Sequence, residues 1–410
     1  MTTAFSGDAT TPAAEPEFPM PRAAGCPFDP APGLKDLQQH GSLTRRRIWD
    51  GSTPWVVTRY DDQRRVLADP RVSADASRPG YPSPTRNADQ GNASFGFILM
   101  DDPEHARLRR MVTAPFMVKR IEAMRPAVQR IVDTLIDDML AGPKPVDLVE
   151  AFALPVPSLV ISDLLGVPYD DHDFFQQNSK DLISLAVTPQ QRGAAFKALY
   201  EYLHALIEQK IAEPAGDVLS GLVPRIAAGE LTRSDAAGIA TLLLLAGHET
   251  TANMIALGTV ALLEHPDQLV RIRDAGDPKV VASAVEELLR YLNITHNGRS
   301  RVATADIEIN GQTIRAGDGI LMPTEIGNRD PAVFADPDRL DVDRDARHHI
   351  AFGFGVHQCL GQPLARMELQ VVFGTLYRRI PGLRLAAPVD ELPFKHDGAV
   401  YGVYELPVTW

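Results

Sequence analysis

The chain has 410 residues, a formal net charge of −12 at pH 7 and 44% hydrophobic residues. The excess of acidic residues argues against general nucleic-acid binding, and the ordinary hydrophobic content predicts a globular protein with a large core. Only two cysteines occur, Cys26 and Cys359. They do not make a disulfide framework, so a reducing cytoplasm is the expected location.

The N-terminal stretch, residues 1–24, is rich in Thr, Ala and Pro and lacks an apolar core. We therefore predict no secretory signal and a flexible arm over 1–24, followed by a single folded domain over 25–410. A strand is predicted over 55–59 and a short helix over 61–68. The loop-like stretch 73–94 is too long for a simple connector, which suggests a functional role.

An acidic cap followed by proline at 101–103 predicts the start of a helix. His105 and Arg109 are four residues apart and therefore share one face of it. Arg107 and Arg110 face elsewhere and are candidates for contact with a protein partner. Taken alone, these basic residues fit a solvated helix face equally well.

Residues 120–300 show mostly helical periodicity, and the strongest helix begins with a capping-box pattern at Thr232 and Asp235. From 236 to 263 the only charged residue is Glu249. A span of that length could cross a membrane, but an ionisable residue at its middle would be most costly in lipid. We therefore predict a buried core helix of about 32 residues and about 48 Å.

The middle of this helix has the sequence Ala-Gly-His-Glu-Thr-Thr over 246–251. Small residues permit the close approach of a ligand, and a hydroxyl that bonds to the helix backbone can open its hydrogen-bond ladder. Thr250 is the preferred hydroxyl, with Thr251 as the alternative. Three residues on roughly the same face are expected to line a pocket: Leu242, Leu245 and Ala246.

Glu287 and Arg290 have a Glu-x-x-Arg spacing that many helices use for a surface ion pair. Further on, a strand is predicted over 307–309, before a turn at Asn310 and Gly311. Two arginines precede that strand: Arg299 and Arg301.

The stretch 352–361 places Cys359 between a glycine-bent turn and a helical pattern. Pro363 fits the first turn of that helix. The unpaired N–H groups and the dipole at a helix start favour a thiolate, which acts as a nucleophile or a metal ligand. A lone cysteine is more often an inert buried thiol. A His-x-Cys pair can also bind zinc, but zinc needs three or four protein ligands and no second cysteine lies nearby.

The complete pattern Phe-Gly-x-Gly-x-His-x-Cys-x-Gly at 352–361 resembles the haem-binding loop of the cytochrome P-450 superfamily. The Ala-Gly-x-Glu-Thr sequence at 246–250 and the Glu-x-x-Arg sequence at 287–290 are similar to two further motifs of that family. The resemblance covers about 25–410 and looks closest to soluble bacterial members, in the actinobacterial branch that oxidises macrolides, statins, sterol-like molecules and drugs. It implies a mainly α, triangular-prism fold with a smaller β region, a long central oxygen-binding helix and a Cys-ligand loop.

The resemblance also implies roles for individual residues. Cys359 would be the metal ligand of haem b, and its thiolate would favour O–O cleavage. Thr250 and Glu249 would manage protons, and Glu287 with Arg290 would form a buried structural network. Other cofactor contacts would come from His105, Arg109, Ala246, Arg301 (with Arg299 as runner-up), Phe352, His357 and Gly361. The substrate pocket would include Leu242, Leu245, Ile294 and Val400, beneath a pair of helices within 170–212 and next to a hairpin tip at 399–403.

The function implied is insertion of one atom of dioxygen into a C–H bond of a lipophilic small molecule. Electrons would come from a separate ferredoxin and an NAD(P)H-dependent ferredoxin reductase. A monomer is expected, with no membrane anchor and no nucleic-acid partner. A local basic patch for an acidic ferredoxin is expected from 344–349 together with Arg366. The alternatives are a non-catalytic haem sensor or carrier and a cysteine hydrolase or zinc protein.

Overall fold

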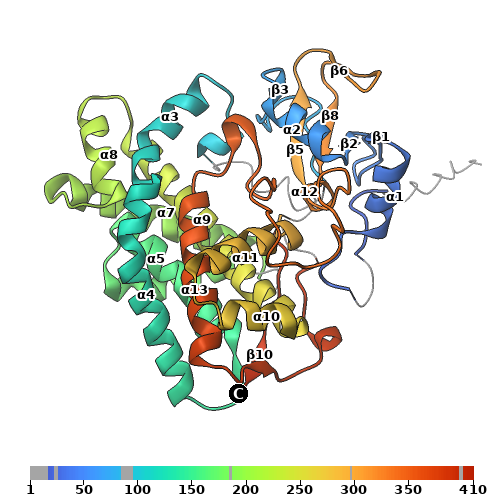
Figure 1. Ribbon diagram of the computed structural model, residues 1–410. Coiled ribbons are helices and arrows are strands. Elements are labelled where there is room, and N and C mark those ends of the chain that lie inside the picture. Colours follow the sequence, from blue (N-terminus) through green and yellow to red (C-terminus); the bar gives the residue numbers. More distant parts are fainter. Residues whose placement is uncertain (1–16, 23–25, 85–95, 184–186, 296–297, 397–399) are drawn as a thin grey trace, which may run out of the picture.

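The computed structural model describes residues 17–22, 26–84, 96–183, 187–295, 298–396 and 400–410. Helices fill the left and centre of Figure 1, and most of the strands gather at the upper right. The predicted mainly α fold with a smaller β region is confirmed.

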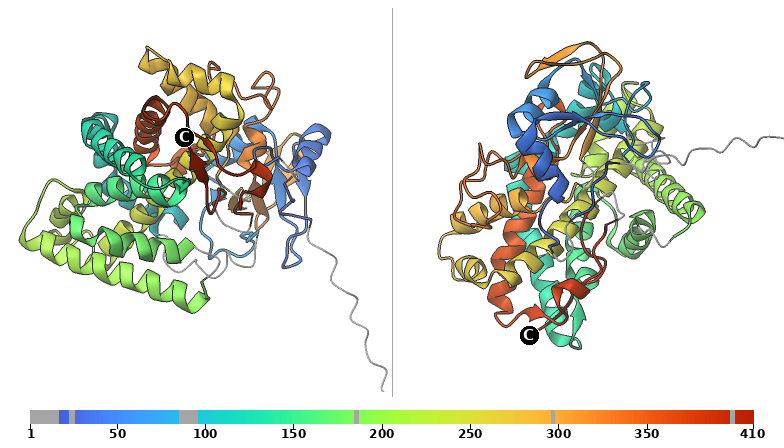
Figure 2. Two further views of the ribbon diagram at one scale, coloured as in Figure 1. Left: turned by 90° about the horizontal axis from the view of Figure 1, so that it is seen from below. Right: turned by 90° about the vertical axis from the view of Figure 1, so that its right-hand side faces the viewer.

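The main sheet combines strands from both ends of the chain. Its order is β1-β2-β8-β5-β3, in which β2 and β8 are parallel and the other pairs are antiparallel. In both views of Figure 2 the blue N-terminal elements accordingly lie beside the orange strands. The elements are α1 (Pro32–His40), β1 (Leu43–Arg45), β2 (Trp55–Val57), α2 (Tyr60–Ala68), β3 (Val72–Ser73), β5 (Arg299–Ala303), β8 (Gly319–Met322) and α12 (Thr324–Gly327).

The helical part is built around α9 (Arg233–Glu264), which packs against α5, α7 and α13. Residues 251–262 of α9 are all buried, as expected of a helix that is apolar all round. The other helices are α3 (Glu104–Thr113), α4 (Val118–Ala141), α5 (Pro155–Leu165), α6 (His172–Ile183), α7 (Pro189–Ala212), α8 (Val218–Ala227), α10 (Pro266–Arg273), α11 (Pro278–Tyr291) and α13 (Gln362–Arg379).

The predicted long helix is confirmed in both length and start. Helix α9 has 32 residues and begins with a capping box, in which the Thr232 hydroxyl accepts from the Asp235 N–H at 3.0 Å. The Asp235 carboxylate accepts from the Thr232 N–H at 3.1 Å in return. Among the residues that the structure describes, no helix combines the length and apolarity needed to cross a membrane.

Short elements complete the fold. The predicted strand over 307–309 and its turn are confirmed, because β6 (Ile307–Ile309) and β7 (Gln312–Ile314) form a hairpin in which Asn310 and Gly311 have positive φ. Strands β4 (Val146–Asp147), β10 (Pro407–Thr409) and β9 (Arg384–Leu385) make a three-stranded sheet. Short helices are η2 (Gly96–Leu99), η3 (Ala114–Phe116), η4 (Val149–Ala153), η5 (Tyr169–Asp171), η6 (Gly355–His357) and η7 (Val389–Glu391).

The predicted N-terminal arm is too long at its inner end. Phe18 is buried in a cluster with Leu34 and Ile48, and the Glu17 N–H donates to the Arg47 carbonyl at 2.8 Å. Residues 17–22 therefore pack on the fold, because one large aromatic side chain removes enough apolar surface from water to hold a short segment. The rest of the predicted arm, 1–16 and 23–24, lies outside the described residues.

Candidate active site

The Cys359 loop has the predicted glycine turn followed by a helix. Gly353 and Gly355 have φ of 75° and 74°, a conformation that favours glycine. The Cys359 N–H donates to the Phe352 carbonyl at 2.8 Å and closes the loop. Helix α13 then begins at Gln362, with a proline in its first turn. The sulfur therefore lies just before a helix N-terminus.

The Cys359 side chain is exposed, but the surrounding protein still raises the pKa of its thiol by desolvation. The Gly361 N–H and the guanidinium groups of Arg299 and Arg109 act in the opposite direction and lower it. A thiolate at Cys359 therefore stays a prediction, because without a bound metal the desolvation of the thiol outweighs the neighbouring N–H groups and guanidinium charges. A coordinating metal cation would reverse the balance, since a coordinating thiol is deprotonated.

Cationic side chains from two elements surround this loop. Arg299 donates to the Ala351 carbonyl at 2.8 Å and to the Thr324 hydroxyl at 3.1 Å. Arg109 on α3 donates to the Gln358 carbonyl at 2.6 Å. Burial, together with the charge of the neighbouring Arg301, lowers the pKa of Arg299 to about 10. Such a decrease indicates a site with too little negative charge.

Two histidines join the cluster. The rings of His105 and His357 have centroids 4.0 Å apart. His105 is buried, its Nδ1 lies 3.1 Å from Asp102 Oδ1, and its Nε2 has no hydrogen-bond partner. Burial, followed by the charges of Arg301, His105 and Arg109, lowers the pKa of His357 to about 3. Within the described residues, the cluster therefore has an excess of positive charge and an unpartnered donor or acceptor at His105 Nε2, which suits an anion with several acceptors.

The donor set fits a flat macrocycle that carries a metal and two carboxylates. Arginine and histidine donors suit buried carboxylates, and a cysteine sulfur suits a haem iron. A Cβ added at Gly361 would meet only Cys359 Sγ, at 3.9 Å, so the space beside the sulfur is open. Ala246 is exposed although it lies in the middle of the buried helix α9.

The two threonines of the 246–251 motif have different environments. Thr250 is half-buried and its hydroxyl donates to the Ala246 carbonyl at 2.7 Å, whereas Thr251 is buried. Thr250 therefore shares the accessible face of Ala246, which favours it over Thr251. Of the predicted pocket residues on this helix, Leu245 is half-buried, whereas Leu242 is buried against Gly96 of η2.

Glu249 is buried and has partners that the sequence analysis missed. Its Oε1 lies 2.8 Å from Lys395 Nζ and accepts from Asn253 Nδ2 at 2.7 Å. In the described part of the chain, its Oε2 has no hydrogen-bond partner. Asn253 could have been found from its spacing four residues after Glu249, but no sequence signal points to Lys395. Glu249 and Thr250 are adjacent in sequence, yet they bond to different partners.

Glu287 and Arg290 form a bidentate ion pair with distances of 2.7 and 2.8 Å and no exposed surface. Arg290 also donates to the carbonyls of Asn328 and Pro337. The structure thus places the pair in a buried network that joins α11 to the irregular segment before the cysteine loop.

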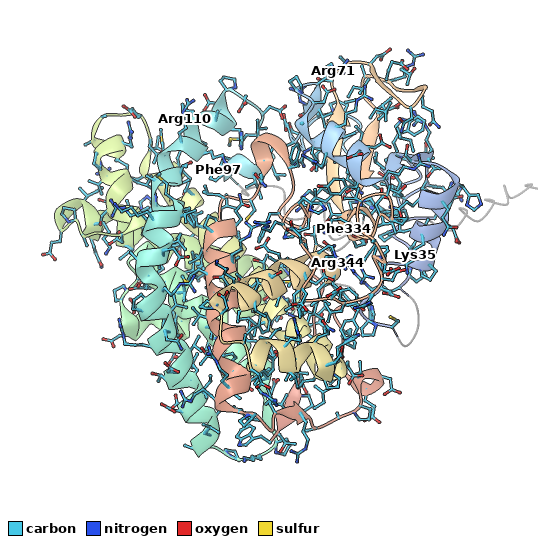
Figure 3. All side chains as sticks on the ribbon, viewed as in Figure 1. Lys35, Arg71, Phe97, Arg110, Phe334 and Arg344 are labelled. Atoms are coloured by element: carbon cyan, nitrogen blue, oxygen red, sulfur yellow. The ribbon has the colours of Figure 1, made fainter. Side chains whose placement is uncertain are left out.

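The predicted basic patch for a ferredoxin is wrong. Arg344 belongs to the network, with its Nε 3.2 Å from the buried Glu287 Oε1, and it is labelled next to Phe334 in Figure 3. Arg366 is 2.7 Å from Glu286, His349 is buried beside that same carboxylate, and the exposed Arg347 pairs with Asp345. Acidic side chains nearby therefore neutralise these basic residues, which the sequence pattern had predicted to be unpaired.

The two remaining pocket candidates lie next to each other. The Tyr401 N–H donates to the Ile294 carbonyl at 2.8 Å, and Val400 pairs with Thr295 in an isolated bridge. Ile294 and Val400 are both half-buried. Residue 399 of the predicted hairpin tip lies outside the described residues. Phe352 is half-buried under the guanidinium of Arg366, 4.6 Å from its ring centroid.

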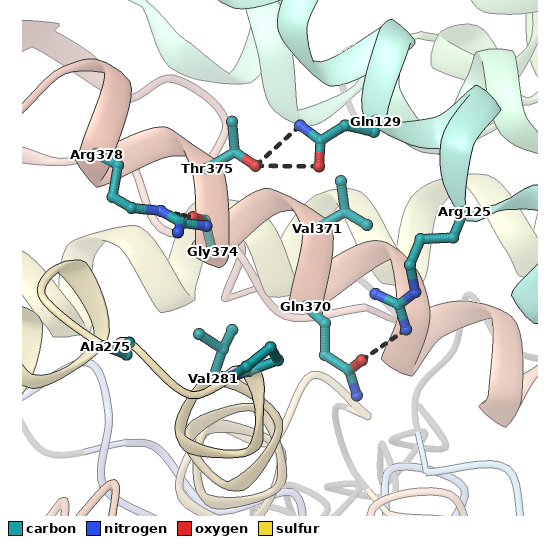
Figure 4. Close-up of a pocket in the computed structure, with 11 residues that line it drawn as sticks. Arg125, Gln129, Ala275, Val281, Gln370, Val371, Gly374, Thr375 and Arg378 are labelled. Atoms are coloured by element: carbon teal, nitrogen blue, oxygen red, sulfur yellow. Dashed lines mark hydrogen bonds between the residues drawn. The ribbon is translucent and has the colours of Figure 1, made fainter.

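A separate cleft of about 440 Å³ lies between α4, α11 and α13 (Figure 4). It is lined by Arg125, Gln129, Ala275, Gly276, Pro278, Val281, Gln370, Val371, Gly374, Thr375 and Arg378. None of the predicted site residues borders it, so it is not the expected substrate pocket.

Comparison with known proteins agrees with this fold. The family model described as Cytochrome P450 matches residues 38–380. Cytochrome P450 GfsF of Streptomyces halstedii is 57% identical over 407 residues, which cover 96% of each chain. The crystal structure of GfsF superposes with a TM-score of 0.93 and covers 97% of this chain and 100% of that one.

Two further relatives have names that state a reaction. The 20-oxo-5-O-mycaminosyltylactone 23-monooxygenase of Streptomyces fradiae is 42% identical over 95% of this chain and 92% of its own. The mycinamicin VIII C21 methyl hydroxylase MycCI of Micromonospora griseorubida, solved with mycinamicin VIII, is 41% identical with a TM-score of 0.88. The match covers 96% of this chain and 99% of that one.

A mainly α fold around one long buried helix, together with a cysteine loop ringed by cations, defines a haem-dependent monooxygenase. The chain belongs to the cytochrome P450 family, and its relatives place it in the actinobacterial branch. It is a cytochrome P450 monooxygenase with a haem-iron cofactor, and it acts with dioxygen and redox partners to hydroxylate a substrate.

Proposed function

We propose that this chain hydroxylates a lipophilic small molecule of the macrolide or polyketide class, using haem b. The observation that supports this best is the Cys359 loop, in which an exposed cysteine lies among half-buried arginines. Statin-like, sterol-like and xenobiotic compounds are further candidates within the same lipophilic class. The family membership argues against a non-catalytic sensor or carrier.

The cofactor would be held by residues already described. Cys359 would ligate the iron, and His105, Arg109, Arg301 and His357 would bind the two carboxylates. Arg299 donates to the loop carbonyl of Ala351, whereas Arg301 donates to the carbonyl of its neighbour Ser300 and interacts with Tyr81. Arg301 is therefore the better candidate for the carboxylates. Ala246, Phe352 and Gly361 would contact the ring, and the bound haem supplies the dioxygen chemistry.

Thr250 and Glu249 would move protons on the oxygen side. The Thr250 hydroxyl lies on the accessible face of α9, and its bond to Ala246 O can open to take a new partner. The unpartnered Oε2 of Glu249 could accept or release a proton.

The substrate class rests on the relatives and on the pocket residues. A tylactone derivative and mycinamicin VIII are named for two relatives of this chain. Leu242, Leu245, Ile294 and Val400 are apolar side chains, which suit a lipophilic ligand.

Electrons would come from a ferredoxin and its NAD(P)H-dependent reductase, with the protein acting as a cytoplasmic monomer. A revised docking surface lies at the junction of α3 and α4, where Met117 and Val118 are exposed beside the exposed Arg110, Lys119 and Arg120. An acidic ferredoxin would fit such a surface, and its binding would weaken as salt is raised.

The substrate proposal is tested by titrating the ferric holoenzyme with macrolide aglycones, glycosylated macrolides, statins and sterols. We expect a blue shift of the Soret band with macrolides, followed by a hydroxylated product when ferredoxin, reductase and NAD(P)H are added. A shift and product with another class alone would overturn the macrolide assignment. An absent red-shifted band after reduction and CO addition would overturn sulfur ligation by Cys359.

A further inference from the structure

A buried ion pair joins the motif of α9 to the C-terminal end of the chain. Lys395 Nζ lies 2.8 Å from Glu249 Oε1, and the two side chains are only 12% and 6% exposed. A buried carboxylate without a partner is costly, and removal of one member strands the other. The pair is therefore a defined feature and not a mobile surface contact.

The backbone around Lys395 holds it firmly in place. The Lys395 N–H donates to the Gly402 carbonyl at 2.8 Å, and Phe394 pairs with Val403 in a bridge. Gly402 lies so close to α9 that an added Cβ would be 1.7 Å from Asn253 Oδ1. Lys395 and Asn253 thus approach the same oxygen of Glu249 from two elements.

The two carboxylate oxygens of Glu249 therefore differ in their hydrogen-bond partners. Oε1 accepts from both Lys395 and Asn253, whereas Oε2 is buried and has no hydrogen-bond partner among the residues that the structure describes. A carboxylate anchored at one oxygen cannot turn freely, so the position of the other oxygen is set by the anchor. The direction in which Glu249 can pass a proton is then decided by the C-terminal segment.

We propose that Lys395 is a positioning residue for Glu249, holding its carboxylate oriented so that Oε2 is the oxygen that exchanges protons. The proposal rests on the acid role of Glu249 given above and adds a residue to it. The segment that carries Lys395 also carries Val400, a predicted substrate contact, which pairs with Thr295 next to Ile294. Contact between the substrate and Val400 would therefore affect the position of Lys395, and through it the carboxylate of Glu249.

The titratable groups that face this pair are few among the described residues. His248 is buried beside Glu249, its Nε2 has no partner, and burial lowers its pKa, so it stays neutral at pH 7. The Tyr404 ring centroid is 5.4 Å from Lys395 Nζ. A pH profile assigned to this site must therefore be compared with one recorded in a His248→Gln background.

The test compares Lys395→Met with Lys395→Arg in the haem-loaded protein. Lys210→Met is the matched control, because Lys210 forms a similarly buried pair with Asp217 at 2.7 Å on other elements. Each protein is measured for product formed per NAD(P)H consumed across pH 5.5–8.5. Infrared spectra of the resting protein report the carboxyl bands of Glu249, which are identified by their disappearance in Glu249→Gln.

We expect Lys395→Met to lower the product yield about 3- to 10-fold, to displace its pH profile and to change the infrared bands of the Glu249 carboxyl group. Lys395→Arg should restore most of the yield, and Lys210→Met should match the parent in all three measurements. Lys395→Met combined with Glu249→Gln should be no worse than Glu249→Gln alone, because the anchor has nothing left to position.

If Lys395→Met has the same yield, pH profile and infrared spectrum as the parent, the inference about Lys395 is overturned and the role of Glu249 is unaffected. A parental yield in Glu249→Gln would instead overturn the proposed acid itself. If Lys395→Met does not retain haem, Lys395→Gln replaces it, since it keeps a donor but removes the charge. Additive losses in the double variant would also contradict the proposal.

Discussion

The chemical role of several side chains depends on their surroundings more than on the residue type. Cys359 shows this, because desolvation raises the pKa of its thiol although it precedes a helix. Thr250 and Thr251 have the same side chain, yet only Thr250 is accessible. The choice between them depends on which face of α9 is covered by neighbouring helices.

Replacing Thr250 by alanine should uncouple the reaction. The variant loses the hydroxyl that now donates to Ala246 O, so proton delivery on the oxygen side would fail while electrons are still consumed. We expect NAD(P)H oxidation near the parental rate, with hydrogen peroxide replacing most of the product, measured by peroxide assay and product quantification. Thr251→Ala is the control. Product yields that fall in Thr251→Ala and not in Thr250→Ala would reverse the assignment.

Glu368 should make the stability of the protein pH-dependent. It is buried, its Oε2 has no partner, and desolvation raises its pKa from 4.5 to about 8. The folded state then binds more protons than the unfolded state between these two values, so stability falls as pH rises through this window. Glu368→Gln should remove this pH dependence. The difference in unfolding free energy between the variant and the parent should therefore be about 1–4 kcal/mol more favourable to the variant at pH 8 than at pH 5.

Denaturant unfolding of the holoenzyme at pH 5, 6.5 and 8 measures this difference. The exposed Glu391→Gln provides the matched control, and its stability should follow the parent at every pH. A constant difference between Glu368→Gln and the parent across this range would show that Glu368 keeps one protonation state.

The C-terminal segment and helix α9 are held together by close backbone packing as well as by side-chain contacts. The segment around Gly402 touches α9 at Asn253, where no side chain on residue 402 has room. The same segment carries Lys395 to Glu249. Contact between the end of the chain and the central helix therefore has both a steric and an electrostatic part.

Gly402→Ala should push this segment away from α9. Its Cβ would be 1.7 Å from Asn253 Oδ1, so either Asn253 moves and loses its bond to Glu249, or the backbone moves and shifts Lys395, whose N–H donates to Gly402. We expect a loss of about 1–3 kcal/mol in unfolding free energy, together with a lower product yield per NAD(P)H. Gly276→Ala, which would meet no atom within 4 Å, should change neither quantity. If Gly402→Ala has the parental unfolding free energy and product yield, the segment can move away from α9 without affecting stability or Glu249.

At the scale of the whole molecule, the Glu287–Arg290 network connects α11 to the carbonyls before the cysteine loop. Arg344 and the Asp341 N–H add bonds to Glu287. The network thereby transmits the packing of the helical part to the segment that presents Cys359.

Glu287→Gln should leave Arg290 as a buried charge without its counter-ion. We expect a cost of about 3–5 kcal/mol and reduced haem incorporation, measured by denaturant unfolding and by the ratio of Soret to protein absorbance. Glu201→Gln is the control, because its pair with Lys197 is exposed and should contribute less than about 1 kcal/mol. Equal losses in the two variants would contradict a special role for the buried pair.

The sequence by itself determined the features written in local patterns: the capped helix α9, the glycine turn before Cys359, the hairpin at Asn310 and the Glu287–Arg290 spacing. Periodicity, turn preferences and capping act between near neighbours, so they can be read directly from the chain. Only the tertiary structure decided that Lys395 reaches Glu249, that Arg344 and Arg366 are neutralised and that Phe18 is buried. These outcomes depend on contacts between residues far apart in sequence, whose energies arise from burial and charge pairing after the chain has folded.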